Sequence, residues 1–401
     1  MASTISSTNI DFENFGQKIN LTVSQNNNNQ NVFLSPASIA LAMAMCAAGA
    51  QNETLNQMLH VLDSSSIEQL AKTAEQIMRI FSIVDNDTQV KLKLVNRLYG
   101  QKAYKLQQDY LSLVQSSFKA DIKLEDFEND SARVVNTING WVEEQTNRLI
   151  NNLLSTNDVT CDTRLIIVNC IYFKGTWVEQ FKEHLTNQNA DFHEANGNVS
   201  KIKLMHQKKT FSYAENGDLN VQIAHLPYQS DKYGVRFVFT VILPKRGIPL
   251  NEVEQKLASK PDLMRQVLND EDTTRKELLL YLPKFKMEGR FELNDVLIQL
   301  GMINAFDGSK ADFTGIVSKQ DDRSGLYISK VIHKAFVDVN ELGSEAAAAT
   351  AVIMTRCCAF REQEEQPIEF KADRPFLFFI RESRKNIVLF SGKFASPPTA
   401  S

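Results

Sequence analysis

One short stretch of the chain, Arg356-Cys357-Cys358, carries residue types that could do chemistry together. A guanidinium forms strong, charge-assisted hydrogen bonds with carboxylates, so Arg356 suits recognition by an acidic pocket. Two adjacent thiols beside a cation could have a lowered pKa and act as reactive thiolates. The stretch therefore indicates a recognition element or a redox switch, and merely tolerated thiols are the simpler alternative to the switch.

Motifs of an enzyme active site are missing elsewhere. The sequence has no Gly-x-Ser-x-Gly elbow, His-Glu-x-x-His helix, Walker loop or Gly-x-Gly-x-x-Gly turn. No two histidines have metal-binding spacing; the six are His60, His184, His193, His206, His225 and His333. We expect no enzyme activity, no cofactor and no metal, although a triad assembled from distant residues stays open.

The thiol cluster lies in a long segment between strand-like regions. Residues 326–340, 376–381 and 387–394 predict strands because they are rich in β-branched and aromatic residues. After the first of them come Gly343, Ser344, Glu345, Ala346, Ala347, Ala348, Ala349 and Thr350. Alanine is a poor strand former, and a connection of about 30 residues is unusually long. A functional loop and an ordinary surface loop both fit this pattern.

Helical and strand-like patterns are distributed unequally along the chain. Helices are predicted over residues 8–25, 36–48, 53–62, 67–84, 109–118, 130–154, 250–268 and 293–300. Further strands are predicted over residues 91–99, 164–173, 200–205, 222–228, 235–243 and 277–283. Because helices gather early, strands gather late and no linker separates two halves, we predict an α+β fold in one interwoven domain.

Composition excludes several classes of partner. The net charge is −4 and the pI is near 6.0, which gives no electrostatic footprint for nucleic acid or an anionic membrane. No apolar window is long enough for a membrane span. The five cysteines show no disulfide or zinc spacing, which suits a reducing compartment. The N-terminus resembles no signal peptide, so we expect a cytoplasmic protein, with non-classical release and extracellular action left open.

Several ordered motifs resemble those of one family. They are Asn31-Val-Phe-Leu-Ser-Pro-Ala-Ser-Ile, Leu94-Val-Asn-Arg-Leu-Tyr-Gly, Val168-Asn-Cys-Ile-Tyr-Phe-Lys-Gly-Thr-Trp, Leu282-Pro-Lys-Phe, Gly343-Ser-Glu-Ala-Ala-Ala-Ala-Thr-Ala and Phe370-Lys-Ala-Asp-Arg-Pro-Phe-Leu-Phe. Over residues 11–397 the chain resembles the serpins, a family of serine protease inhibitors, and looks most like their ovalbumin-type intracellular subgroup. Arg374 stands where the family usually has histidine, which we expect to be a surface detail.

The resemblance implies a single serpin domain over residues 8–397, with three β-sheets, eight or nine helices and an exposed reactive-centre loop over residues 343–366. In this family the cleaved loop inserts as a new strand into the main sheet, so the uncleaved fold is metastable. The loop acts as a suicide substrate, and the expected partner is a target protease held in a covalent complex. We expect a monomer, and the lack of a basic face on residues 67–84 does not support heparin activation.

The residues of the hinge, which begins at Glu341 and Gly343, fit such an insertion. By strand alternation Ser344, Ala346 and Ala348 share one inward face with Thr350, and this face is uncharged, while Glu345 points outward. A charge on the inward face would be costly to bury. The hinge therefore favours an inhibitor over a non-inhibitory serpin that acts as a binding module or chaperone.

The residue before the cleaved bond has two candidates. The family's usual spacing from Glu341 indicates Cys357, whereas chemistry favours Arg356, because the acidic specificity pocket of trypsin-like proteases binds a guanidinium. We predict cleavage at Arg356-Cys357 by a trypsin-like protease, with Cys357-Cys358 as the second choice. Chymotrypsin-like and cysteine proteases are the alternative targets.

The resemblance also assigns structural roles. The shutter, a polar cluster under the point where the sheet opens, matches Ser35, Ser38, Asn169 and His333. The breach, where the hinge enters the sheet, matches Trp177 and Lys284 beside Glu341.

Overall fold

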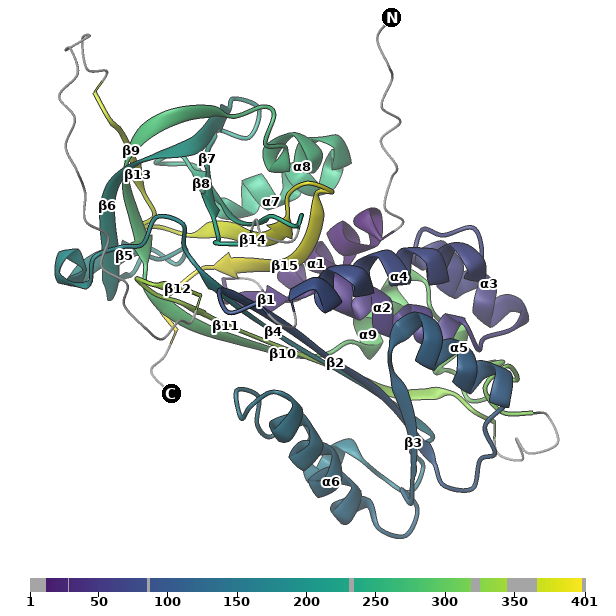
Figure 1. Ribbon diagram of the computed structural model, residues 1–401. Helices are drawn as coiled ribbons and strands as arrows, with labels where there is room; N and C mark the ends of the chain where they lie inside the picture. Colours follow the sequence, from purple (N-terminus) through teal and green to yellow (C-terminus); the bar gives the residue numbers. More distant parts are fainter. Residues whose placement is uncertain are drawn as a thin grey trace, which may run out of the picture.

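The computed structural model describes residues 12–27, 29–84, 87–230, 234–318, 325–344 and 366–398. This part of the chain contains nine α-helices and two hydrogen-bonded sheets. Figure 1 shows most of the helices at one end, strands with two short helices at the other, and long strands running between the two ends.

The helical end forms around α2 (Pro36–Ala47), which is buried over its whole length. Its N-terminus is capped by Ser35, whose side chain accepts a hydrogen bond from the Ser38 N–H. A helix that is apolar on every side must be covered on every side. Around it lie α1 (Glu13–Asn26), α3 (Asn52–Val61), α4 (Ile67–Val84) and α5 (Gln108–Phe118), and α9 (Asn294–Leu300) packs against α1.

The six-stranded sheet has the order β10-β11-β12-β4-β2-β3. Its strands are β2 (Val90–Gln101), β3 (Asp121–Glu125), β4 (Leu165–Thr176), β10 (Phe285–Glu292), β11 (Ile328–Val339) and β12 (Gly343–Ser344). Strands β4 and β11 are parallel and pair directly from Leu165 and Ile328 to Tyr172 and Phe336. Among the described residues, only the two of β12 lie between them, at one end. We call this direct contact of β4 with β11 the seam.

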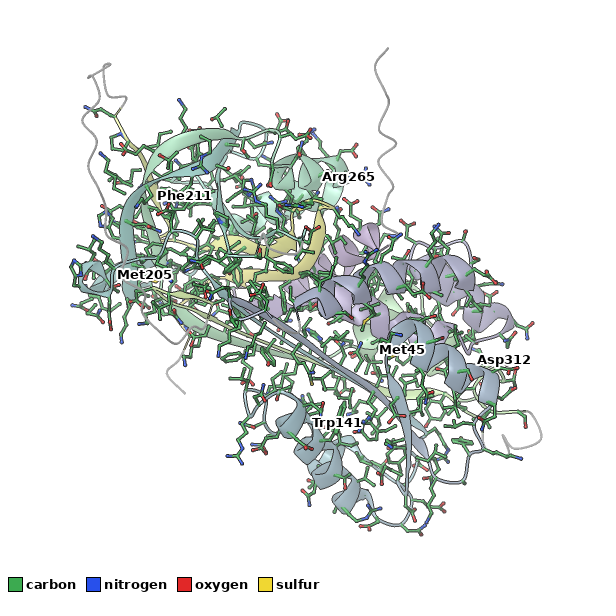
Figure 2. All side chains as sticks on the ribbon, in the orientation of Figure 1. Met45, Trp141, Met205, Phe211, Arg265 and Asp312 are labelled. Carbon is green, nitrogen blue, oxygen red and sulfur yellow. The ribbon has the colours of Figure 1, made fainter. Side chains whose placement is uncertain are left out.

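Both faces of the seam are covered. Helix α2 packs against one face, and α6 (Ser131–Gln145) packs against the other, below the sheet in Figure 1. The α6 side has a core of its own, in which Val134 and Ile138 of the helix join Val168 and Ile332 of the two seam strands. Trp141, labelled on α6 in Figure 2, lies 3.8 Å from the guanidinium of Arg97 on β2.

The nine-stranded sheet has the order β1-β15-β14-β8-β7-β6-β9-β13, and β5 pairs with β6. Its strands are β1 (Val32–Leu34), β5 (Asn187–His193), β6 (Val199–Asn216), β7 (Val221–Pro227), β8 (Phe237–Pro244), β9 (Thr274–Pro283), β13 (Ile368–Lys371), β14 (Phe376–Glu382) and β15 (Ile387–Phe394). Strand β6 pairs with β9 over residues 204–213 and with β7 over residues 212–216. Because β6 pairs with both neighbours, the described strands form two hydrogen-bonded sheets.

Two predicted helices are wrong in extent. The helix predicted over residues 130–154 ends at Gln145, because Asn147 and Arg148 have left-handed backbones with φ of 51° and 63°. The helix predicted over residues 250–268 is two helices, α7 (Leu250–Ser259) and α8 (Pro261–Leu268). Proline disfavours a helical conformation in the residue before it, and Lys260 has φ of −136° and ψ of 86°.

The α+β class is confirmed, and five strands were not predicted, of which β12 and β13 have only two and four residues. Strands β3, β5 and β10 carry many charged or polar residues, so their sequences lack the apolar character on which strand prediction depends. Within the described ranges, no helix has both the length and the apolar composition to cross a membrane.

The backbones of the two sheets approach closely at Gly289 of β10, so the stability of the fold should be sensitive to a side chain at this position. A Cβ atom there would lie 1.9 Å from the carbonyl oxygen of Phe33 on β1, so Gly289→Ala must shift backbone. We expect this change to destabilise the fold by about 1–3 kcal/mol. Gly140→Ala is the control, because a Cβ there meets nothing within 4 Å and helix propensity predicts a gain of about 0.5–1 kcal/mol. Thermal unfolding measures both, and equal effects would contradict the assignment.

Candidate functional site

The chain reverses direction where β11 ends. Asn340 N–H donates to the Gly343 carbonyl at 2.8 Å, and the Asn340 side chain oxygen accepts from the N–H groups of Leu342 and Gly343 at 3.0 and 3.2 Å. β12 then runs antiparallel to both seam strands, with Ser344 opposite Val339 on one side and Gly175 on the other. We call residues 340–344 the hinge turn. Its last two residues occupy the end of the seam.

Space at this end of the seam is very narrow. A Cβ atom on Gly343 would lie 1.9 Å from the carbonyl oxygen of Gly175, so only glycine fits. A Cβ on Gly175 would in turn lie 2.7 Å from the ring of Tyr228. Ser344 is fully buried, and its hydroxyl is 2.7 Å from the Tyr228 hydroxyl. The end of the seam therefore admits a glycine followed by one small polar side chain.

Two stacked aromatic rings hold the hinge turn in place. Trp177 and Tyr228 stack with ring centroids 4.4 Å apart and an interplanar angle of 13°. The indole N–H of Trp177 donates to the Asn340 carbonyl at 2.9 Å, and its backbone N–H donates to the Leu342 carbonyl at 2.9 Å. Burial raises the pKa of Tyr228, so its hydroxyl stays protonated and can bond to Ser344.

An ion pair anchors the outer side of the hinge turn. The Glu341 carboxylate is 2.7 Å from the Lys284 ammonium and accepts a hydrogen bond from the Thr186 hydroxyl at 2.8 Å. Burial alone would raise the pKa of Glu341, but the bonds from Lys284 and Thr186 outweigh it and keep the pKa below its usual value. Glu341 is therefore ionised at neutral pH.

A row of polar side chains crosses the middle of the sheet. His333 on β11 lies opposite Asn169 on β4, which lies opposite Asn96 on β2. The His333 Nδ1–H donates to the Asn169 side chain oxygen at 2.5 Å, and the Asn169 amide donates to Asn96 and to the Ser38 carbonyl. Below the row, Ser35 N–H donates to His333 Nε2 at 3.1 Å. We call His333, Asn169 and Asn96 the polar row.

The polar row is tied to the start of α2. The Ser38 hydroxyl is 3.0 Å from the Asn169 side chain oxygen, and the Ser35 hydroxyl donates to the Leu389 carbonyl on β15 at 2.5 Å. Burial lowers the pKa of His333 to about 3, so the imidazole is neutral at physiological pH. The neutral tautomer with its proton on Nδ1 donates there and accepts at Nε2, which matches both contacts of His333.

Comparison with known proteins decides the family. The family model described as Serpin (serine protease inhibitor) matches residues 11–397. The chain belongs to the serpin family. The leukocyte elastase inhibitor of Homo sapiens is 36% identical over 383 residues, which cover 96% of this chain and 97% of that protein. Serpin B9 of Homo sapiens is 34% identical over 381 residues, which cover 93% and 95%.

Solved serpin structures match over nearly the whole chain. The native stressed conformation of AtSerpin1 from Arabidopsis has a TM-score of 0.83 and 30% identity, covering 99% of this chain and 100% of that one. Uncleaved ovalbumin has a TM-score of 0.80 and 27% identity, covering 96% and 99%. The predicted serpin fold and the resemblance to the ovalbumin-type subgroup are confirmed.

The described part of this serpin brings the predicted site residues into two groups. Glu341, Gly343, Ser344, Trp177 and Lys284 meet at the end of the seam, and Ser35, Ser38, Asn169 and His333 meet at its middle. Glu345, Ala346, Ala347, Ala348, Ala349, Thr350, Arg356, Cys357 and Cys358 lie outside the described residues. The functional roles of all these residues stay predictions.

Several partners of these groups were not predicted from the sequence. They are Tyr228, Asn340, Thr186 and Asn96. Tyr228 is the last residue of one predicted strand and Asn96 lies within another, so neither has a local signal that separates it from an ordinary strand residue. Asn340 and Gly343 are both of turn-forming type, so their spacing could have predicted the turn after β11.

The expectation for Arg374 is wrong. Its side chain is only 15% exposed and donates to the carbonyls of Pro244 and Lys371 at 2.8 and 3.0 Å. It also pairs with Asp373 at 3.0 Å. Arg374 therefore ties the end of β13 to the end of β8, which a surface residue would not do.

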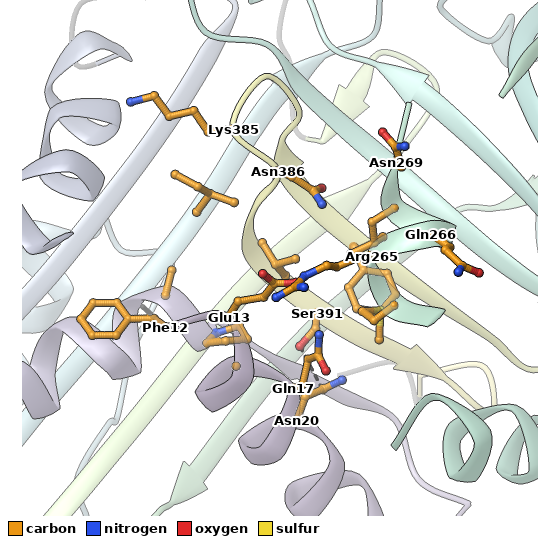
Figure 3. Close-up of a pocket in the computed structure, with 18 of the residues that line it drawn as sticks. Phe12, Glu13, Gln17, Asn20, Arg265, Gln266, Asn269, Lys385, Asn386 and Ser391 are labelled. Atoms are coloured by element: carbon orange, nitrogen blue, oxygen red, sulfur yellow. Dashed lines mark hydrogen bonds and ion pairs between the residues drawn. The ribbon is translucent and has the colours of Figure 1, made fainter. Parts of the chain in front are cut away.

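A separate cavity of about 350 Å³ lies between α1, α8 and the turn from β14 to β15 (Figure 3). The ion pair of Arg265 with Glu13, at 2.9 Å, joins α8 to α1 across it. None of the predicted site residues line this cavity. Within the described ranges, no group of His, Cys, Asp and Glu side chains could hold a metal ion.

The neutral state of His333 predicts a dependence of stability on pH. Because the pKa is about 3 in the folded protein and 6.5 ordinarily, the unfolded chain binds an extra proton between these values. The contribution of His333 to stability is therefore complete above pH 6.5 and is lost as the pH falls toward 3. We expect the urea midpoint of the wild type to fall between pH 7.5 and pH 5 more than that of His333→Gln.

The control for this experiment is Cys161→Ser, which alters an exposed free thiol. It should keep the pH dependence of the wild type. Parallel pH profiles for the wild type and His333→Gln would contradict the assignment, whatever the loss of stability at pH 7.5.

Proposed function

We propose that this serpin inhibits serine proteases as a suicide substrate, through insertion of its cleaved loop into the seam. The observation that carries the proposal is the position of Gly343 and Ser344, which already pair with both seam strands. A strand that continued from them would replace the direct pairing of β4 with β11 by two new ladders. Relatives that are named as inhibitors of leukocyte elastase support the same class of activity.

Cleavage of the loop supplies the freedom that insertion needs. An intact loop is held at Ser344 in the seam and at β13 on the edge of the other sheet, which begins at Ile368. A cut between these anchors frees the Ser344 end to extend β12. Each added residue gains backbone hydrogen bonds and burial, so insertion proceeds downhill and carries an attached protease with it.

The side chain at position 344 tests insertion directly. Ser344 is fully buried, so Ser344→Arg would place a guanidinium where no water can reach it. We expect trypsin to cleave this variant at the same bond without forming an SDS-stable complex, whereas the wild type forms one.

Glu345→Arg is the matched control, since strand alternation places position 345 outward. It should keep complex formation within about threefold of the wild type, because an exposed charge contributes little. Equal complex formation by Ser344→Arg would contradict insertion. Cleavage of the wild type without any complex would favour a non-inhibitory serpin.

We also propose a trypsin-like target that cuts at Arg356-Cys357. The guanidinium of Arg356 suits an acidic specificity pocket, and we expect Arg356→Ala to slow complex formation with trypsin by at least about tenfold, because a hydrogen bond to a charged group is worth about 1.5–3 kcal/mol. Arg361→Ala, in the same loop, is the control and should leave the rate unchanged. The released C-terminal peptide should begin at Cys357.

Elastase is the second candidate target, since four of the similar proteins are named as leukocyte elastase inhibitors. The small side chain of Cys357 suits a small specificity pocket, and cleavage would then release a peptide that begins at Cys358. An elastase complex that forms equally well with Arg356→Ala, together with such a peptide, would replace trypsin by elastase as the target class.

A further inference from the structure

A second hollow, of about 630 Å³, lies beside the hinge turn. It is lined by Gln89, Val178, Arg236, Arg275 and the segment 227–230 that follows β7. Its size is within the range of sites that bind small organic molecules. We call it the arginine pocket, after the two cations that line it.

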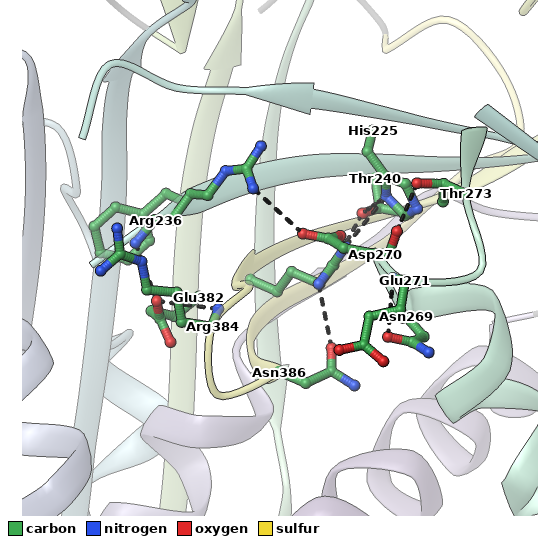
Figure 4. Close-up of polar contacts among 12 residues, drawn as sticks. His225, Arg236, Thr240, Asn269, Asp270, Glu271, Thr273, Glu382, Arg384 and Asn386 are labelled. Atoms are coloured by element: carbon green, nitrogen blue, oxygen red, sulfur yellow. Dashed lines mark hydrogen bonds and ion pairs between the residues drawn. The ribbon is translucent and has the colours of Figure 1, made fainter. Parts of the chain in front are cut away.

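The charge of the arginine pocket is positive and incompletely neutralised. Neither Asp nor Glu is among the eight described residues that line it. Figure 4 shows Arg236 reaching Asp270, but the distance is 3.9 Å, and Asp270 also binds the buried guanidinium of Arg381. Within the described ranges, Arg275 is exposed and has no carboxylate at ion-pair distance. The pocket therefore carries two guanidinium groups and no carboxylate among its described lining residues.

The pocket also has an apolar wall. Val178 is 49% exposed, which makes it one of the few large apolar side chains on the described surface, and it lies beside Pro227, whose carbonyl accepts its N–H at 3.0 Å. An apolar ring placed against this wall would cover surface that is now in water. The combination fits a molecule with one ring system and one acidic group.

The segment 227–230, which lines the pocket, also supports the hinge turn. Gln229 N–H donates to the Thr176 carbonyl at 2.8 Å, and the Gln229 side chain donates to the Trp177 carbonyl at 2.9 Å. Tyr228, which lies between Pro227 and Gln229, is bonded to Ser344. A molecule that ties the start of β8 and β9 to this segment therefore restrains the residues that keep Ser344 buried.

We propose that the arginine pocket binds a small aromatic carboxylate or sulfonate, and that binding holds Ser344 in the seam. The acidic group accepts hydrogen bonds from Arg236 and Arg275, and the ring packs on Val178 and Pro227. Coupling is reciprocal, so the anion binds more weakly when the hinge turn leaves the seam. This goes beyond the proposed inhibition and does not depend on it.

Binding is tested with 8-anilinonaphthalene-1-sulfonate as the probe, by its fluorescence in a Trp141→Phe background, in which Trp177 is the remaining tryptophan. We expect Arg275→Glu to weaken probe binding at least about tenfold, Arg275→Lys to restore most of it, and Arg265→Ala, in the cavity of Figure 3, to leave it unchanged. The uncharged parent, 1-anilinonaphthalene, should bind much more weakly. Unaltered binding in Arg275→Glu, or loss in Arg265→Ala, would overturn the site.

Coupling to the hinge turn is tested without any protease. Ser344→Cys is made in a chain that also carries Cys161→Ser, Cys357→Ser and Cys358→Ser, so that the remaining native thiols, Cys46 and Cys170, are buried. Saturating probe should slow labelling of the introduced thiol by about fivefold or more, the lower end of usual coupling between sites. Arg275→Glu should abolish this slowing. Labelling that is equally fast with and without bound probe would overturn the coupling.

Discussion

The direct pairing of β4 with β11 is the contact on which the rest of the six-stranded sheet depends. Parallel neighbours that share a full hydrogen-bond ladder leave no room for another strand. β12 is antiparallel to both strands, and its two residues pair with the backbone of each. The same two strands are therefore paired directly over most of their length and separated by β12 at one end.

Polar side-chain contacts cross the middle of the seam. The polar row crosses β11, β4 and β2 inside a core that is otherwise apolar, and it is bonded to the first turn of α2. Buried polar groups are costly when unpaired, so the strands cannot separate here until His333 and Asn169 find new partners. Under the proposed mechanism, an entering strand would offer backbone groups at this height, which opening without such a strand would not.

Long, regular segments could be predicted because their signals are local. The apolar run of β4, the apolar helix α2 and the amphipathic α4 lie within a few residues of their predicted bounds. The end of α6 could not be predicted, because left-handed backbones at Asn147 and Arg148 carry no glycine signal. The break before α8 did have a sequence signal, Pro261, but the helical periodicity of the residues on both sides favoured one continuous helix.

The candidate site could be assembled from the sequence only through the family resemblance. Ser35, Asn169 and His333 are separated by more than a hundred residues at each step, and no spacing rule brings such positions together. Tyr228 had no counterpart in the quoted motifs and was missed, although its hydroxyl meets Ser344. Arg374 was predicted to be a surface residue only because it replaces the family's usual histidine. Its bonds to two carbonyls depend on tertiary structure, which the sequence does not show.

The order of residues in the hinge follows from the shape of the seam's end. Gly343 touches the backbone of Gly175, and Gly175 is itself confined by the Tyr228 ring, so no side chain fits at the point of entry. The next inward position is Ser344, whose hydroxyl forms a hydrogen bond with the Tyr228 hydroxyl. If the proposed insertion proceeds, each later inward residue would pass the stacked rings of Trp177 and Tyr228. In the proposed insertion, a run of alanines from Ala346 would meet that steric demand at little loss, because two ladders would stabilise the inserted strand whatever alanine's own preference.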